Sequence, residues 1–315
     1  MTKRIAITGA TGFIGGYMVK GLARAGHQVR ALVRPGRQSA LVKPEVGLPV
    51  EFHEGDLTQP ETIEGFLKDV DILLHLASAH DHFPEEVMKA VNITGTTVLL
   101  DEAKKNARKG FEIWVVSSAV IGTPTYSYYR DSKRVQEKLI RGSGIPWASF
   151  RPTLVYGIGD MRHTAYILRK LSKKRGIYPI PHSGKSKINP VHVEDVVDAV
   201  LRYFDFDRGV DCVYELAGPE GIPYNDFIRI TMKAAGGNMK IMNFPKKWVD
   251  RLIFLKGFFT DVTEDRRGSS YFMLHHDHNI SNAWDELGWR PRPYAEGIVS
   301  VAAGDWWRHG ELLKL

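Results

Sequence analysis

Short apolar segments rich in β-branched residues recur through the first half of the chain and alternate with segments of helical periodicity. Apolar runs of this length are typical of parallel strands that are buried on both faces. The pattern predicts strands at Arg4–Thr8, Gln28–Val33, Val50–His53, Ile72–Leu76, Ile113–Ser117 and Trp147–Leu154. It predicts helices at Gly16–Ala25, Pro60–Phe66, Pro84–Lys105 and Ser127–Arg141. This alternation indicates an α/β fold with a doubly wound parallel sheet.

Three glycines follow the first predicted strand directly, and a helical segment follows them. In a strand–turn–helix unit, this spacing is typical of a Rossmann-type dinucleotide site. The first glycine permits a tight turn, the second lets the backbone approach a pyrophosphate, and the third lets the helix pack close to the strand. The helix N-terminus then faces the phosphate charge. Cofactor contacts are therefore predicted at Gly9, Thr11, Gly12, Phe13, Ile14 and Gly15.

The alternating pattern ends after Val155-Tyr156-Gly157. The next stretch mixes basic residues, prolines and glycine, which predicts a helix followed by an irregular loop. The segment Val193–Phe204 has apolar residues at helical spacing and indicates a return to the main domain. We therefore predict a Rossmann-type domain of residues 1–158 and 188–213, and a smaller α/β substrate lobe of residues 159–187 and 214–315.

The end of the second predicted strand decides how the adenosine ribose of a dinucleotide is held. An acidic residue there would bind the 2′-hydroxyl, but this chain has Arg34, with Arg37 close behind. Guanidinium groups make charge-assisted bonds to phosphate, so the pair favours NADP(H) over NAD(H). Two solvated loop arginines are the alternative interpretation. Further cofactor contacts are predicted after the third and fourth strands, at Asp56, Leu57, Leu76, Ala77 and Ser78.

Tyr129 and Lys133 stand four positions apart in the predicted helix Ser127–Arg141, so they project from one face of it. The usual tyrosine pKa of about 10 is too high for the side chain to act as a base at neutral pH. A neighbouring ammonium group favours the phenolate and lowers that pKa, and Lys133 can also hydrogen-bond the nicotinamide ribose. A hydroxyl at the end of the fifth strand, from Ser117 or Ser118, would hold the substrate oxygen.

Amino-acid composition and charge limit the classes of protein to which the chain can belong. Hydrophobic residues make up 43% and charged residues 25% of the 315 positions, which is typical of a globular protein. The net charge of +7 is mild, and the sequence has no basic stripe with interleaved aromatic residues, so nucleic-acid binding is not expected. Apolar runs are too short to span a membrane, so no membrane partner is expected. The single cysteine, Cys212, and an N-terminus without a signal peptide favour the cytoplasm. Consecutive ligands at His275-His276-Asp277-His278 cannot converge on one ion, so no metal is expected.

Together these motifs resemble those of the extended short-chain dehydrogenase/reductase family, also called the NAD(P)-dependent epimerase/dehydratase superfamily. The resemblance runs through nearly the whole chain. It is carried by Thr8–Gly15, Gly55-Asp56-Leu57, His75-Leu76-Ala77, Val91–Thr96, Val116–Ala119, Tyr129–Lys133, Arg151–Gly157, Pro190–Val196 and Leu287–Pro291. The resemblance implies Ser118 as the donor to the substrate oxygen, Tyr129 as acid/base with Lys133 as its partner, and Asn92 as a helix residue completing the site. It also implies Pro152 and Val155 beside the nicotinamide.

The segment from Ser118 to Tyr129 is shorter than in many members of this family, and it commonly lines the substrate site. The leading hypothesis is an NADP(H)-dependent oxidoreductase that acts on a secondary alcohol or carbonyl. One alternative is a nucleotide-sugar epimerase or dehydratase that recycles its cofactor internally. Another is a non-catalytic NADPH-binding protein. Since the helices Pro84–Lys105 and Ser127–Arg141 form the dimer bundle in many relatives, a homodimer is expected.

Overall fold

A parallel seven-stranded sheet organises the computed structural model, which describes residues 2–37, 49–124, 126–181, 183–206, 211–258 and 278–308. The strand order is β11-β6-β5-β4-β1-β2-β3, and every neighbouring pair in this sheet is parallel. The order reverses between β1 and β4, the place where doubly wound sheets bind ligands. The strands are β1 (Arg4–Thr8), β2 (Gln28–Val33), β3 (Val50–Glu54), β4 (Ile72–His75), β5 (Glu112–Val116), β6 (Trp147–Pro152) and β11 (Cys212–Leu216). The predicted Rossmann-type sheet is confirmed.

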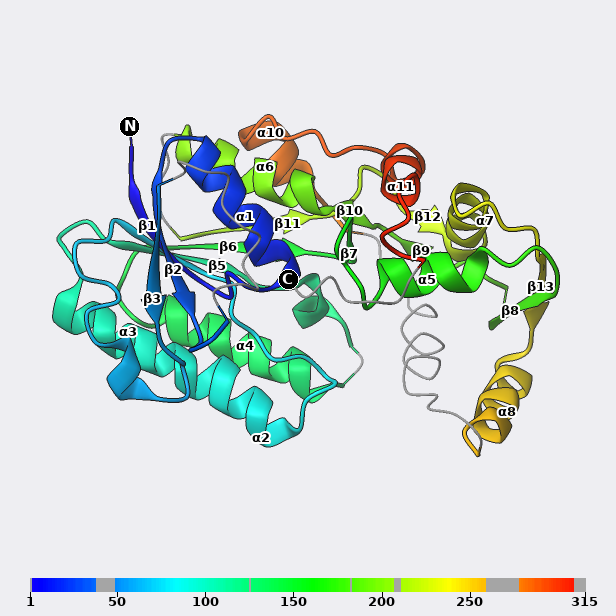
Figure 1. Cartoon of the computed structure of the whole chain (residues 1–315), viewed down its shortest axis with the longest axis horizontal. Coiled ribbons are helices and arrows are strands. Elements are labelled where there is room, and N and C mark those ends of the chain that lie inside the picture. The colour runs from blue at the N-terminus through cyan, green and yellow to red at the C-terminus, as the bar shows by residue number, and fades with distance from the viewer. Residues whose placement is uncertain are drawn as a thin grey trace.

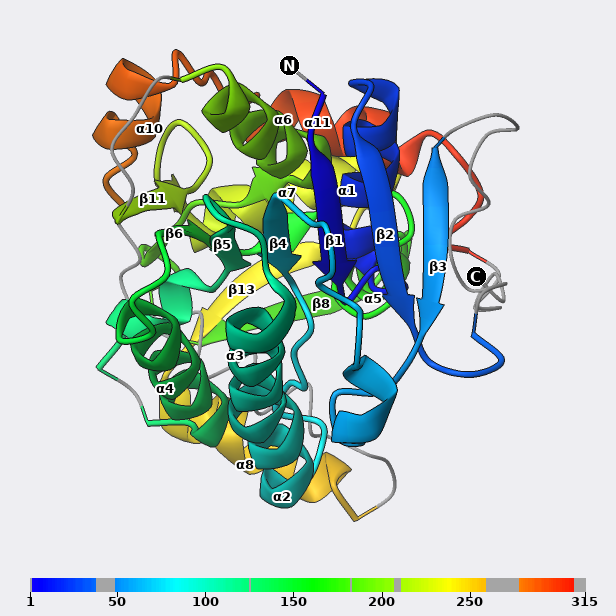
Figure 2. The ribbon, with the colours of Figure 1, turned by 90° about the vertical axis from the view of Figure 1, so that its left-hand side faces the viewer.

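Helices cover both faces of the sheet (Figures 1 and 2). One face carries α1 (Phe13–Arg24) and α6 (Val193–Phe204), which pack so closely that a Cβ on Gly21 would lie 2.4 Å from Val197 Cγ1. The opposite face carries α3 (Gly95–Asn106) and α4 (Tyr128–Arg141). Two separate apolar cores result, one on each side of the sheet, because its strands are buried on both faces.

The smaller lobe has its own apolar core, centred on residues such as Leu168, Phe227 and Ile298. A short parallel pair, β8 with β13, and two further two-stranded pairs lie outside the main sheet. Among the described residues, no helix is both long and apolar enough to cross a bilayer. The remaining elements are β7 (Val155–Tyr156), α5 (Thr164–Leu171), β8 (Ile177–Pro181), β9 (Lys187–Ile188), β10 (Val191–His192), β12 (Ile222–Pro223), α7 (Tyr224–Ala234), β13 (Lys240–Phe244), α8 (Lys246–Lys256), α10 (Ser281–Glu286) and α11 (Tyr294–Ala302).

The apolar cores depart from the predicted lobe boundaries in two places. Strand β11 pairs with β6 as far as Leu216, so residues 214–216 belong to the main sheet and not to the substrate lobe. Further on, Ala283 and Trp289 pack into the core beneath α6, and the Trp289 indole donates to the carbonyl of Asp195 at 2.8 Å. The sequence prediction placed both segments in the substrate lobe, because local periodicity carries no information about which distant core a segment joins.

Most predicted elements are present with ends shifted by a few residues. The predicted strand Trp147–Leu154 ends at Pro152, and a separate strand, β7, follows it. The helix predicted at Pro60–Phe66 was wrong: only a 3₁₀ turn, η2 (Pro60–Ile63), forms there, before Gly65 adopts φ +76°. The helix predicted at Pro84–Lys105 is divided into α2 (Glu85–Met88), a π-helical turn η3 (Lys89–Thr94) and α3. Such π turns are frequent at functional sites.

Candidate active site

A cleft of about 2430 Å³ opens at the carboxyl ends of the strands, between the sheet domain and the smaller lobe. Pockets for small ligands usually measure about 300–1,000 Å³. The larger volume is sufficient for a dinucleotide together with a substrate. Its walls include the turn after β1, the ends of β4 and β5, the first turn of α4, and α5.

The glycine turn forms a close backbone cradle at one end of this cleft. Gly9 has φ +71°, and a Cβ there would lie 2.7 Å from the Ala77 nitrogen. A Cβ on Gly15 would lie 2.0 Å from the Gly9 carbonyl oxygen, so α1 approaches β1 as closely as the sequence predicts. Gly12 caps α1 without a side-chain hydrogen bond, and no acidic residue stands in the first turn. These residues fit a pyrophosphate, because the free helix amides and the helix dipole favour an anion there.

The predicted adenosine contacts also line the cleft. Arg34 and Arg37 both reach it, together with Asp56 and Leu57. None of the ion pairs between described residues uses either arginine. The Asp56 carboxylate accepts from the Thr58 amide at 2.9 Å and from the Thr58 hydroxyl at 2.8 Å, so local bonds fix its position. This end of the cleft is basic and suits a phosphorylated ribose.

Tyr129, Lys133 and Ser118 all face the cleft, as predicted. Ser127 caps α4 by accepting from the Arg130 amide at 3.1 Å, which sets where the helix begins and so which face carries Tyr129 and Lys133. The Tyr129 ring stacks on the His80 imidazole, with centroids 4.6 Å apart and an interplanar angle of 29°. His80 is open to the cleft but crowded by its walls. This desolvation, and then the charge of Lys133, lowers the pKa of His80, so the imidazole is neutral.

The two serines at the end of β5 occupy different environments. Ser118 is half-buried, and its oxygen accepts from the Val120 amide at 3.3 Å, so its own O–H stays able to donate to a substrate oxygen. Ser117 is buried, and its hydroxyl lies near enough to the Glu137 carboxyl to help lower the pKa of that group. The Ser117 hydroxyl nevertheless has no hydrogen-bond partner within bonding geometry among the described residues. Of the two candidates, this arrangement favours Ser118 as the donor to a substrate oxygen.

Lys133 is almost fully buried, with its ammonium held in place by two oxygen acceptors. Its Nζ donates to the Val116 carbonyl at 3.3 Å and to Gln136 Oε1. Burial lowers the pKa of Lys133 to about 8, although Glu137 opposes this shift. The Glu137 carboxyl is also buried, yet hydrogen bonds from Arg151 hold its pKa below the usual value. Lys133 therefore changes charge close to the physiological pH range.

Gln136 connects this lysine to a fully buried polar network that sequence reasoning missed. Because Lys133 donates to its Oε1, Gln136 directs Nε2 at His75 Nε2, 3.0 Å away. Burial and the Lys133 charge lower the pKa of His75 to about 3, so the ring is neutral and accepts there. His75 Nδ1 then donates to Thr8 Oγ1 at 2.6 Å. Thr8 also accepts from the Ala77 amide at 3.1 Å, so the network reaches the cradle.

Asn92 does not line the cleft, in contrast to the role that the resemblance implies. It lies in the π turn with its side chain fully buried behind the cleft wall. Its amide accepts from the Ala79 nitrogen at 2.7 Å and donates to the Ala79 carbonyl at 2.9 Å and to the Ser132 hydroxyl at 2.9 Å. The two bonds to Ala79 hold the segment next to His80, so Asn92 positions the site without facing the cleft.

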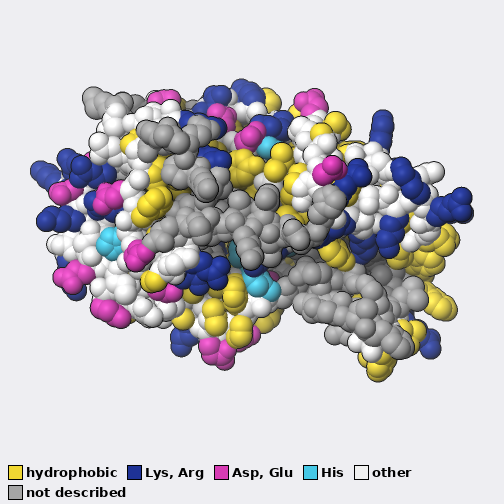
Figure 3. Space-filling model, viewed as in Figure 1, with side chains coloured by type: hydrophobic (Ala, Val, Ile, Leu, Met, Phe, Trp, Pro, Cys, Tyr) yellow, Lys and Arg dark blue, Asp and Glu magenta, His cyan; other side chains and the backbone are white. Residues whose placement is uncertain are grey.

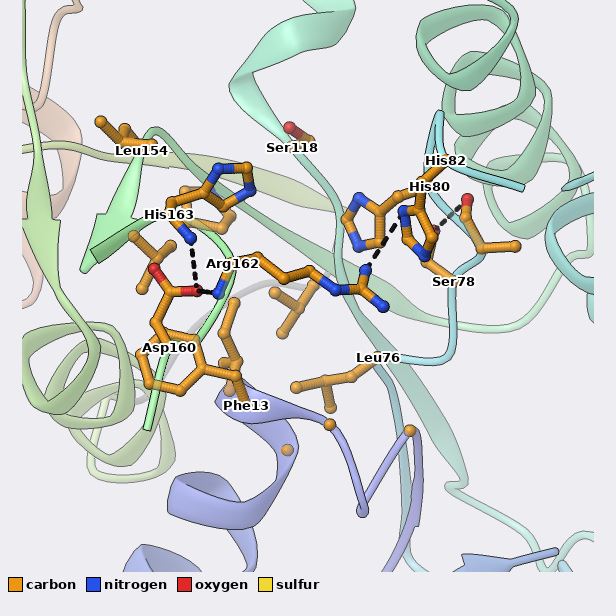
Figure 4. Close-up of a pocket in the computed structure, with 18 of the residues that line it drawn as sticks. Phe13, Leu76, Ser78, His80, His82, Ser118, Leu154, Asp160, Arg162 and His163 are labelled. Carbon is orange, nitrogen blue, oxygen red and sulfur yellow. Dashed lines mark hydrogen bonds between the residues drawn. The ribbon is translucent and has the colours of Figure 1, made fainter. Parts of the chain in front are cut away.

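The substrate side of the cleft carries a group of histidines around one arginine (Figure 4). Arg162, from the segment after β7, extends across to His82, where its Nη1 lies 3.1 Å from Nδ1. Asp160 supports this segment, since its carboxylate accepts from the amides of Arg162, His163 and Thr164. The contact joins the two walls of the cleft. His80 and His82 lie in the segment that leaves the carboxyl end of the fourth strand, and that position is the signal that could have identified them.

All the predicted site residues except Asn92 line the cleft, including Pro152 and Val155. His192 is buried, and its Nδ1 accepts from the Glu194 amide at 3.3 Å as the cap of α6. The residues 275–277 lie outside the described part of the chain, while His278 contacts Glu215 at 3.0 Å. No cluster of three candidate metal ligands occurs among the described residues.

A family model named NAD dependent epimerase/dehydratase family matches residues 5–217, so the chain belongs to that family and is one of its enzymes. Members bind a nicotinamide cofactor. The chain is 27% identical to a ceramide reductase of Caulobacter vibrioides, over 94% of this chain and 89% of that protein. It is 26% identical to a UDP-glucose 4-epimerase of Vibrio cholerae, over 96% of this chain and 95% of that protein. The crystal structure of gox2253 covers 99% of both chains with a TM-score of 0.75 and 25% identity.

Proposed function

We propose that this enzyme is an NADPH-dependent reductase of a ketone or aldehyde, working in either direction between the carbonyl compound and the corresponding secondary or primary alcohol. The observation that carries this proposal is the shared cleft. Ser118, Tyr129 and Lys133 face the same space as the glycine cradle and Arg34. The similarity to a protein named ceramide reductase supports a reductase and directs the first substrate tests to lipid carbonyl compounds.

The chain's own residues supply orientation and the proton. The Ser118 hydroxyl would donate to the substrate oxygen and hold the carbonyl carbon in the cleft. Bound NADPH would supply the hydride. Tyr129 would give its phenolic proton to the same oxygen as the alcohol forms. The buried Lys133 ammonium would stabilise the phenolate that remains.

The choice of NADPH is tested by Arg34→Asp. Removing a guanidinium–phosphate contact and adding a negative charge should weaken NADPH binding roughly 10–100-fold. NADH binding should change much less, because NADH has no 2′-phosphate. Fluorescence titration of both cofactors, with Arg229→Asp on the distant helix α7 as control, measures this difference. Equal losses for both cofactors would contradict recognition of the 2′-phosphate.

Cofactor exchange separates this function from the epimerase alternative, which the similarity to UDP-glucose 4-epimerase supports. Purified protein is denatured, released nicotinamide is identified, and the emptied protein is titrated with NADPH and NADH. A reductase should be isolated largely empty and take up NADPH reversibly. Near-stoichiometric retained cofactor would favour internal recycling and redirect the assays to sugar nucleotides. Reversible NADPH binding without turnover on any carbonyl compound would instead favour the non-catalytic alternative.

A further inference from the structure

Helix α8 presents an apolar surface to solvent. The exposed fractions are 61% for Trp248, 56% for Phe254, 51% for Leu255 and 69% for Phe258, which directly follows the helix. Globular proteins rarely gather large apolar side chains on one exposed face, and such a patch marks an interaction site. Figure 3 shows hydrophobic and basic side chains at the lower right edge of the molecule, where α8 lies in the same view of Figure 1.

The exposed side chains lie on one side of the helix. Trp248 and Leu255 are seven positions apart, and Phe254 and Phe258 are four apart, which is the spacing of one helical face. The two phenyl rings contact each other edge to face, with centroids 5.1 Å apart. On the other side of the helix, Ile253 is half-buried and lines the cleft. The apolar face therefore points away from the protein and stands close to the cleft.

Basic side chains share this outward face. Lys247 and Arg251 are exposed and fall at the same helical angles as the phenylalanines. The whole helix sequence, KKWVDRLIFLK, has four basic residues and one acidic residue. Aromatic and aliphatic side chains between lysines and arginines are typical of helices that lie in the interface of an anionic membrane. Tryptophan is favoured at that depth because its ring is amphipathic.

The size of the face argues against a second copy of the chain as its occupant. Three aromatic side chains and a leucine offer on the order of 500 Å², whereas a stable protein interface buries about 800 Å² on each partner. A bilayer needs no matching surface, and a short apolar face with basic neighbours is sufficient for reversible binding.

We propose that α8 docks on the surface of an anionic phospholipid bilayer, with Trp248, Phe254, Leu255 and Phe258 inserted among the acyl chains and Lys247 and Arg251 on the headgroups. This mode is peripheral and differs from that of a membrane-spanning helix, for which no helix among the described residues is long and apolar enough. Docking would bring the cleft mouth, lined there by Ile253, close to the lipid surface. The inference does not depend on the reaction, because it concerns a surface outside the catalytic residues.

Cosedimentation with vesicles tests the proposal on the full chain. We expect at least about tenfold tighter binding to vesicles of phosphatidylcholine mixed with phosphatidylglycerol than to phosphatidylcholine alone. The triple variant Trp248→Ser, Phe254→Ser, Phe258→Ser should lose at least about tenfold in this affinity, as should Lys247→Glu with Arg251→Glu. The control, Phe52→Ser with Val299→Ser, removes exposed apolar side chains elsewhere and should bind like the original protein.

Three results would overturn the proposal that α8 docks on an anionic bilayer. The first is absence of binding to mixed vesicles, and the second is unchanged binding by either α8 variant. The third is a change of oligomeric state in the triple variant without any vesicle binding, which would assign the face to a second copy of the chain. Thermal unfolding and NADPH titration verify that each variant is folded, and the charge variant keeps the test decisive if the triple variant is not.

Discussion

At the scale of single residues, the site depends on how polar groups are satisfied in a dry interior. Lys133, Gln136 and His75 are each nearly or fully buried, so each hydrogen bond fixes the orientation of the next group. The sequence could identify Tyr129 and Lys133 because their spacing is local. It could not identify Gln136, because its partners His75 and Thr96 come from other parts of the chain.

Gln136→Glu should raise the pKa of Lys133 from about 8 by at least about one unit, since it places a negative charge on the ammonium. Lys133 is charged below its pKa and neutral above it, so the alkaline limb of the activity profile should move to higher pH. Of the groups around it, Glu137, His80 and Tyr129 keep their side chains, whereas His75 loses the amide donor of Gln136 and faces a carboxylate oxygen instead. Side-chain NMR of Lys133 against pH measures the shift without turnover. Gln136→Met, which removes the acceptor without adding charge, should give no upward shift.

Tyr129→Phe should lower reductase activity by about 10²–10⁴, because the substrate oxygen loses its proton donor. NADPH affinity should stay within about twofold, since the glycine cradle and Arg34 are intact. Steady-state NADPH oxidation with a carbonyl substrate measures the first quantity and fluorescence titration the second. Tyr128→Phe, on the neighbouring position of α4, is the matched control and should remain active. Undiminished turnover in Tyr129→Phe would contradict the proposed mechanism.

At the scale of elements, the sheet was predictable because its central strands, such as β1 and β4, are short and mostly apolar. The helix α6 matches its predicted bounds, Val193–Phe204, because a strong helical pattern follows a capping histidine. The predicted helix at Pro60–Phe66 failed because a few favourable residues do not outweigh a glycine that leaves the helical region. The π turn that buries Asn92 was also unpredictable, because its bonds to Ala79 and Ser132 are tertiary.

Gly15→Ala tests the close packing of α1 on β1. Its Cβ would lie 2.0 Å from the Gly9 carbonyl oxygen, so the helix or the turn must move. We expect a loss of about 2 kcal/mol or more in the free energy of unfolding and a cofactor affinity reduced at least about tenfold. Chemical denaturation and NADPH titration measure the two effects. Gly122→Ala, whose Cβ meets open space, should change neither, and an equal loss there would remove the steric explanation.

At the scale of the whole molecule, one contact ties the C-terminal segment back to the sheet domain. Arg292 donates to the Asp195 carboxylate from its backbone nitrogen and its Nε, both at 2.9 Å. Burial opposes the charge of Arg292, but Asp195 raises its pKa overall. Helix α11 follows directly and belongs to the core of the smaller lobe, so this contact helps to fix the two lobes across the cleft. The expected homodimer through α3 and α4 stays a prediction.

Asp195→Asn should lower the free energy of unfolding by about 1–3 kcal/mol, because it removes a charged acceptor shared by several donors in a buried position. Asp198→Asn, on the same helix, breaks a pair with Arg202 whose side chains are both well exposed, and should cost less than about 1 kcal/mol. Denaturant unfolding monitored by fluorescence compares the two variants. Equal losses would show that the Arg292 contact does not contribute specially to the joining of the lobes.

The stack of His80 on Tyr129 has a stereochemical consequence. His80 covers one face of the Tyr129 ring, so a substrate that packs against this ring can lie only over its other face. In the proposed reduction, this restriction would favour one orientation of a prochiral ketone relative to the cofactor, and the alcohol formed would be predominantly of one handedness. Asn92 holds the adjoining Ala79 in place, so the handedness of the product of the proposed reaction would depend on a buried amide behind the cleft wall.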